Sequence, residues 1–166
     1  MPKAKYQYED FLGNVNDDCK RFVLAVHELL LQEKYKPKVQ VMKSTGLQLS
    51  YAEPKVKGVI GIILIFFMRE DELVVRIYAK NHNAYHDVLN GLPETIVRQI
   101  NNAPDCVKFS DPNKCWKGCI EYDFHIQGKL YQKCYISCFQ LVVDARSNPY
   151  LLALIESEVK ARANKS

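Results

Sequence analysis

The stretch VIGIILIFF at residues 59–67 decides the fold. It carries no charge, and a short apolar run between turn residues is typical of a strand that is buried on both faces. The wider apolar segment from Gly58 to Met68 is eleven residues long, whereas a membrane-spanning helix needs about 20 residues. The sequence therefore predicts the central strand of a sheet and no membrane partner.

Half-buried strands are predicted on both sides of this segment, because apolar and polar residues alternate there with a period of two. The inward residues would be Leu47, Leu49, Tyr51, Leu73, Val75 and Ile77. A further alternating segment lies near residues 38–42, and the segments are separated by short turns. Short connections favour antiparallel neighbours, so we expect a meander of about four strands.

Helices are predicted at residues 14–34, 82–90, 93–101 and 148–159, from apolar spacings of three and four and from capping residues. A C-terminal β-hairpin is predicted from residues 119–126 and 129–143, joined by the turn Gln127-Gly128. The fold class is therefore α+β, with helices packed mainly on one face of the sheet. We expect residues 1–166 to form a single domain.

The composition and charge of the chain limit which partners and which cellular location we expect. The chain has 166 residues, of which 48% are hydrophobic, and a net charge of +4. Its pI of about 8.7 and its scattered lysines make nucleic acid an unlikely partner, and a nucleic-acid accessory role is the weakest of three alternatives. The first ten residues, MPKAKYQYED, lack the apolar region of a secretory signal, so we expect a cytoplasmic location and reduced thiols.

The usual catalytic motifs are missing from the sequence. There is no G-x-S-x-G, H-E-x-x-H, C-x-x-C, G-x-G-x-x-G or G-x-x-x-x-G-K segment. Catalytic groups can meet in space without such a motif, so the absence assigns no reaction. It favours a protein that binds rather than one that catalyses.

The leading hypothesis is a small binding or interaction domain that uses one face of the meander. If the apolar residues point inward, Gln48, Ser50, Arg76 and Tyr78 share the opposite face. An arginine among hydrogen-bonding side chains suits a carboxylate or phosphate group. The ligand would be a small anion or a protein partner, and an exposed strand edge would also allow a homodimer.

The alternative hypothesis is a zinc-binding or metal-dependent protein. Four of the six cysteines form the pattern Cys115-x3-Cys119 and Cys134-x3-Cys138 on either side of the hairpin. On a regular strand, Cys134 and Cys138 would be about 13 Å apart, whereas two sulfurs on one zinc ion lie within about 4.6 Å. The expected ligands are therefore Cys106, Cys115, Cys119 and Cys134. Without metal, these thiols would be small buried apolar groups.

Overall fold

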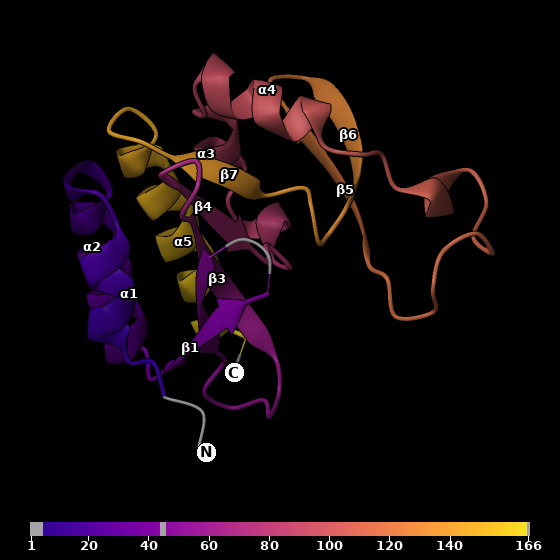
Figure 1. The fold of residues 1–166 in the computed structure, drawn as a ribbon. Coiled ribbons are helices and arrows are strands. Elements are labelled where there is room, and N and C mark those ends of the chain that lie inside the picture. Colours follow the sequence, from indigo (N-terminus) through magenta and orange to yellow (C-terminus); the bar gives the residue numbers. More distant parts are fainter. Residues whose placement is uncertain (1–4, 44–45, 166) are drawn as a thin grey trace.

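A five-stranded antiparallel sheet forms the centre of the computed structural model, which describes residues 5–43 and 46–165 (Figure 1). The sheet order is β1 (Lys36–Met42), β2 (Gly46–Ala52), β3 (Ile60–Phe67), β4 (Glu72–Ile77) and β7 (Gln140–Val143). The apolar strand β3 is central, as predicted. Its residues 61–66 are all buried, because helices cover one face of the sheet and β3 lies between β2 and β4.

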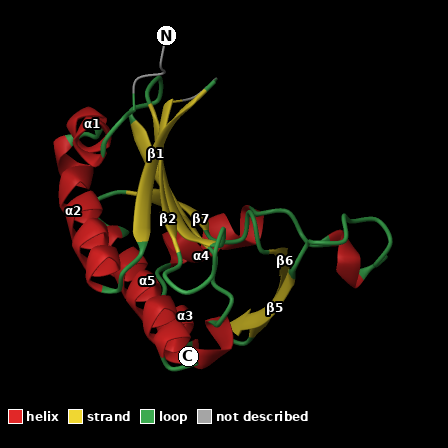
Figure 2. Ribbon diagram, turned by 90° about the horizontal axis from the view of Figure 1, so that it is seen from below, coloured by secondary structure: helices red, strands yellow, loops and turns green. Residues whose placement is uncertain are grey.

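The helices lie mainly on one face of this sheet, as predicted (Figure 2). They are α1 (Tyr8–Asn14), α2 (Asp17–Gln32), α3 (His86–Asn90) and α5 (Asn148–Ala163), and α4 (Glu94–Asn102) lies beside β7. Two 3₁₀ helices, η1 (His82–Ala84) and η2 (Val107–Phe109), complete the elements described. The α+β fold is therefore confirmed. No helix among the described residues has the length and apolar character needed to cross a bilayer.

Of the two N-terminal helices, α2 was predicted from the sequence and α1 was not. Asn16 caps α2, since its side-chain oxygen accepts a hydrogen bond from the Cys19 N–H at 3.0 Å, so this helix begins at Asp17 within the predicted range of residues 14–34. Helix α1 was not predicted, because it contributes only one fully buried residue, Phe11. A single inward residue gives no periodic pattern to detect.

The hairpin of β5 (Glu121–Ile126) and β6 (Lys129–Cys134) forms a separate two-stranded sheet. Its turn lies at Gln127 and Gly128, as predicted, and both residues have positive φ angles, of 50° and 81°. Two-residue hairpin turns commonly require this conformation at both positions, which favours glycine. The turn therefore sets the register of the whole hairpin.

The prediction of one strand over residues 129–143 is wrong. Strand β6 ends at Cys134, residues 135–139 form a turn, and β7 then pairs with β4, with Gln140 opposite Arg76. The Cys138 N–H donates to the Cys134 carbonyl at 3.0 Å and closes the turn. The physical reason is a contact between distant segments. The edge of β4 has backbone N–H and C=O groups that pair with β7, and this pairing outweighs the strand propensity of residues 135–139.

The segment of residues 103–120 extends away from the rest of the chain (Figures 1 and 2). Its only regular element is the three-residue helix η2. Connections of this length are uncommon in compact domains unless they have a function or a local support. This projecting loop is therefore a second candidate functional region.

Candidate functional site

The outer face of the sheet is the face without helices, and it carries the four predicted ligand-binding residues. Ser50, Ile63, Arg76 and Gln140 lie side by side in one row across four strands. Gln48 lies two residues from Ser50 on β2, so it shares that face. The sequence thus placed this set of side chains on the correct face.

Tyr78 belongs to the same face. It follows Arg76 by two residues, and its N–H continues the ladder by donating to the Gly61 carbonyl at 3.1 Å. Ser50 contributes less than predicted to the surface. It is buried, and its hydroxyl donates to the Lys38 carbonyl at 3.4 Å. Arg76, Tyr78 and Gln48 remain accessible to a partner.

Arg76 is half-buried and has a neutral partner. Its Nε and Nη2 atoms donate to the Gln140 Oε1 atom at 3.0 and 2.6 Å. In the part of the chain that the structure describes, no carboxylate lies within 4.0 Å of Arg76. The guanidinium charge is therefore held in place but not neutralised. Sequence reasoning missed Gln140, because nothing local indicates that β7 lies beside β4.

Two tyrosine rings border Arg76. The Tyr78 and Tyr135 rings have their centroids 5.7 Å apart, and Tyr135 comes from the turn that the sequence reading missed. Burial, together with Tyr78 and two neighbouring thiols, raises the pKa of Tyr135, although Arg76 lowers it. Tyr135 therefore keeps its hydroxyl proton near neutral pH and can donate a hydrogen bond.

The outer face is closed underneath by buried side chains of β3. Ile63 and Ile65 beneath it are only 7% and 3% exposed. Arg76 does not line any of three cavities of about 410–700 Å³ that lie elsewhere in the described chain. A ligand at Arg76 would consequently lie against the face without being enclosed.

A second arginine, Arg162 on α5, lies in a buried network that the sequence did not reveal. Its Nε atom donates to the Glu158 carboxylate at 2.9 Å, and its Nη1 atom lies 2.9 Å from the Glu53 Oε1 atom. Its Nη1 and Nη2 atoms also donate to the Tyr35 hydroxyl and the Tyr78 carbonyl. Burial lowers the pKa of Arg162, but Glu158, Tyr35 and Glu53 outweigh this effect and raise it, so the guanidinium stays charged.

Glu158 is completely buried and is surrounded by donors. It accepts hydrogen bonds from the Tyr85 hydroxyl at 2.6 Å and from the Asn81 backbone and side-chain N–H groups at 3.1 to 3.3 Å. Burial and the Glu158 charge raise the pKa of Tyr85, so this hydroxyl remains a donor. The network holds α5 to the chain that follows β4, which is a structural role.

A cavity of about 520 Å³ opens beside this network, between the ends of α2 and α5. Its lining includes the exposed side chains of Lys34, Lys55 and Lys165. Within residues 5–43 and 46–165, none of these lysines has an ion pair within 4.0 Å. Cavities of this size suit small ligands.

Three of the four predicted metal ligands lie close together. The Cys119 Sγ atom is 3.7 Å from the Cys134 Sγ atom, and the Cys115 thiol is near enough to Cys119 to affect its pKa. Burial, with contributions from these two thiols, raises the pKa of Cys119 to about 12. Cys106 is placed differently. Its N–H donates to the Gln132 carbonyl at 3.0 Å, and it lines a cavity along β6.

Metal binding by these residues stays a prediction. Among the described residues, no three or more His, Cys, Asp or Glu side chains are already arranged to hold a metal ion. All six cysteines are free.

Comparison of the chain with protein-family models, with curated proteins and with solved structures finds no match of any of the three kinds.

Proposed function

We propose that the protein is an interaction domain whose outer sheet face binds an acidic segment of a partner protein. The observation that carries the proposal is the state of Arg76. A half-buried guanidinium is oriented by the Gln140 amide and has no carboxylate partner among the described residues. Arginine is suited to paired hydrogen bonds with a carboxylate, so a partner's acidic side chain would supply the missing charge.

The charges around Arg76 support an acidic partner. Lys36 and Lys38 lie on the same face of β1 and are exposed. The acidic residue on this face of β4, Glu72, is four residues from Arg76, which is about 13 Å along a strand. Lys38 is three strands from Arg76, which is about 14 Å at about 4.8 Å per strand, so the lysines and Glu72 lie at similar distances. Arg76, Lys36 and Lys38 outnumber Glu72 on this face, and this excess of positive charge favours association with a negatively charged surface.

The shape of the face supports a macromolecular partner rather than an enclosed small molecule. Small ligands are usually held in concave sites, and none of the three cavities includes Arg76. Arginine and tyrosine are also the residues that most often dominate binding energy at protein interfaces. Arg76, Tyr78 and Tyr135 form such a group.

The proposal is tested by fluorescence anisotropy with a labelled peptide rich in glutamate and leucine, and by mapping its contacts with amide NMR shifts. We expect shifts at Arg76, Gln140 and Gln48. We expect Arg76→Gln to weaken binding about tenfold or more, because hydrogen bonds to charged groups contribute about 1.5–3 kcal/mol. The matched control is Arg21→Gln, an equal charge change on the exposed side of α2.

Two results would overturn the proposal. One is equal weakening by Arg76→Gln and Arg21→Gln, which would mean nonspecific attraction to net charge. The other is the absence of binding by the peptide at low salt, where charge attraction is strongest. Light scattering of the free protein at several concentrations also tests whether a second copy occupies the face. A dimer abolished by Arg76→Gln would replace the acidic partner with a homodimer.

A second candidate is a small anionic ligand in the cavity between α2 and α5. It is favoured by the volume of about 520 Å³ and by the basic lining residues, three lysines and Arg162, which outnumber the two lining carboxylates, Glu33 and Glu53. Titration with citrate should shift the amides of Tyr35 and Lys55, and Lys55→Gln should reduce the effect. Shifts that are absent at these residues would exclude the cavity as an anion site.

A further inference from the structure

The broken strand changes what the cysteines can do. Because β6 ends at Cys134 and the Cys138 N–H bonds to the Cys134 carbonyl at 3.0 Å, these cysteines lie at the two ends of one helix-like turn. Residues four apart in such a turn have Cβ atoms about 5–6 Å apart on the same side. The strand geometry that separated their sulfurs by about 13 Å no longer applies.

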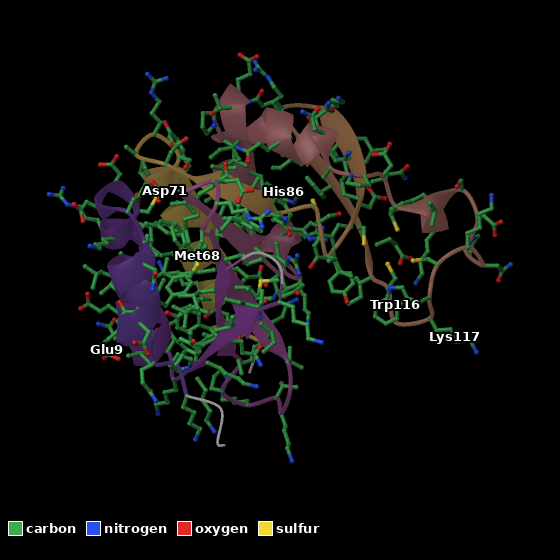
Figure 3. The ribbon with its side chains drawn as sticks, in the orientation of Figure 1. Glu9, Met68, Asp71, His86, Trp116 and Lys117 are labelled. Atoms are coloured by element: carbon green, nitrogen blue, oxygen red, sulfur yellow. The ribbon has the colours of Figure 1, made fainter. Side chains whose placement is uncertain are left out.

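The other two cysteines of the pattern lie next to this turn. The Cys119 and Cys134 sulfurs are 3.7 Å apart, and the Cys115 thiol is near enough to Cys119 to affect its pKa. In a tetrahedral zinc site with bonds of about 2.3 Å, neighbouring sulfurs are about 3.8 Å apart. Cys119 and Cys134 are therefore already separated by one edge of such a tetrahedron. Figure 3 shows sulfur atoms grouped near Trp116, in the projecting loop.

We propose that Cys115, Cys119, Cys134 and Cys138 form a structural zinc site, in which Cys138 replaces the predicted ligand Cys106. The ion would bind four thiolates and release their protons to solvent. Since no three ligands are yet arranged around one point in the described chain, Cys115 and Cys138 must turn toward the edge formed by Cys119 and Cys134. Cys106 stays outside, because it faces the cavity along β6.

The projecting loop gives an independent reason for a metal at this place. Residues 103–120 contain one three-residue helix, and Trp116 in this segment is 57% exposed. A zinc ion would join Cys115 and Cys119 of the loop to Cys134 and Cys138 at the junction of β6 and β7. Structural zinc sites stabilise loops of this kind directly, because the binding free energy becomes folding free energy.

The experiment uses untagged full-length protein produced with zinc in the medium, with metal content measured by mass spectrometry. We expect about one zinc per chain. After zinc is removed under reducing conditions, titration with Co²⁺ should give the absorption bands of four-thiolate coordination. Cys115→Ser, Cys119→Ser, Cys134→Ser and Cys138→Ser should each weaken binding at least about tenfold. The matched controls Cys19→Ser and Cys106→Ser should bind like the unaltered chain.

Several outcomes would overturn this proposal. Less than about 0.2 zinc per chain, with no cobalt bands, would exclude the metal site. A metal-free protein whose mass is lower by two hydrogen atoms, with Cys119 linked to Cys134, would identify a disulfide pair instead. Normal cobalt binding by Cys138→Ser would remove Cys138 from the site. If that buried substitution prevents folding, Cys115→Ser in the half-buried loop decides whether the thiols bind metal.

Discussion

Arg162 and Arg76 are both half-buried, yet their surroundings are opposite. Arg162 has two carboxylates, Glu158 and Glu53, and its side chain is 12% exposed. Among the residues that the structure describes, Arg76 has the exposed Gln140 amide as its partner and no carboxylate within 4.0 Å. The first arginine is satisfied inside the fold and leaves no capacity for a partner. The second keeps its charge available, and this difference distinguishes a structural arginine from a candidate binding residue.

The largest expected effect comes from removing the satisfied arginine. Arg162→Met leaves Glu158 buried without its counter-charge, so the free energy of unfolding should fall by about 3–5 kcal/mol. Denaturant unfolding followed by circular dichroism measures this. Arg98→Met breaks the exposed pair with Glu94 and should cost only about 0–1 kcal/mol. If Arg162→Met lowers the free energy of unfolding by less than about 1 kcal/mol, Arg162 is not the structural arginine that the comparison with Arg76 requires.

Tyr85→Phe tests the same network with a smaller change. It removes the hydroxyl that donates to Glu158 at 2.6 Å, so we expect a loss of about 1.5–3 kcal/mol. Tyr122→Phe is the matched control. The Tyr122 hydroxyl is buried and has no hydrogen-bond partner in the described chain, so its removal should leave stability equal or higher. Equal losses in the two variants would show that Tyr85 acts only through packing.

Arg76→Gln should leave the fold almost unchanged. The substitution leaves no buried charge unpaired, and the Gln140 side chain that loses its donors is exposed. We expect a change within about 0.5 kcal/mol in the same unfolding assay. A loss as large as that of Arg162→Met would mean that Arg76 supports the sheet, and it would remove the argument for a binding role.

The smallest expected effect is a pH dependence of stability that comes from His27 and not from either arginine. Burial lowers the pKa of His27 below its ordinary value of about 6.5, although Glu9 raises it slightly. The unfolded chain then binds this proton more readily than the folded chain. Stability from His27 is therefore complete above about pH 6.5 and falls as the pH decreases toward the lowered pKa. His27→Gln should reduce the change in the free energy of unfolding between pH 7 and pH 5. If this pH dependence is the same in the variant, the assignment to His27 is contradicted.

Much of the outer face could be predicted from the sequence. The alternation of Leu73, Val75 and Ile77 placed Arg76 on the opposite side, because side chains on a strand have a period of two. Gln140 and Tyr135 were not predictable in this way. Residues 135–139 continue a strand-like pattern, and only the distant edge of β4 makes the chain turn there.

One feature of the sequence, an acidic residue among the apolar residues of α5, could have indicated the Arg162 network but was not used in the prediction. Leu151, Ile155 and Glu158 fall on one stripe of α5, and all three are fully buried. A carboxylate on an apolar stripe requires a buried partner, since an unpaired buried charge is costly. Arg162, four residues after Glu158, continues the stripe. Its other partners, Glu53 and Tyr35, come from distant segments, so no local pattern could identify them.

The pairing of β7 with β4 also has a consequence for the order of folding. Arg76 and Gln140 are 64 residues apart, whereas the strands from β1 to β4 follow one another through short connections. Closing a long loop costs chain entropy before its contacts form, so distant strand pairs are slow to assemble. We expect the meander to form first and β7 to add last. The outer face of the sheet would then be completed only after residues 140–143 have been synthesised.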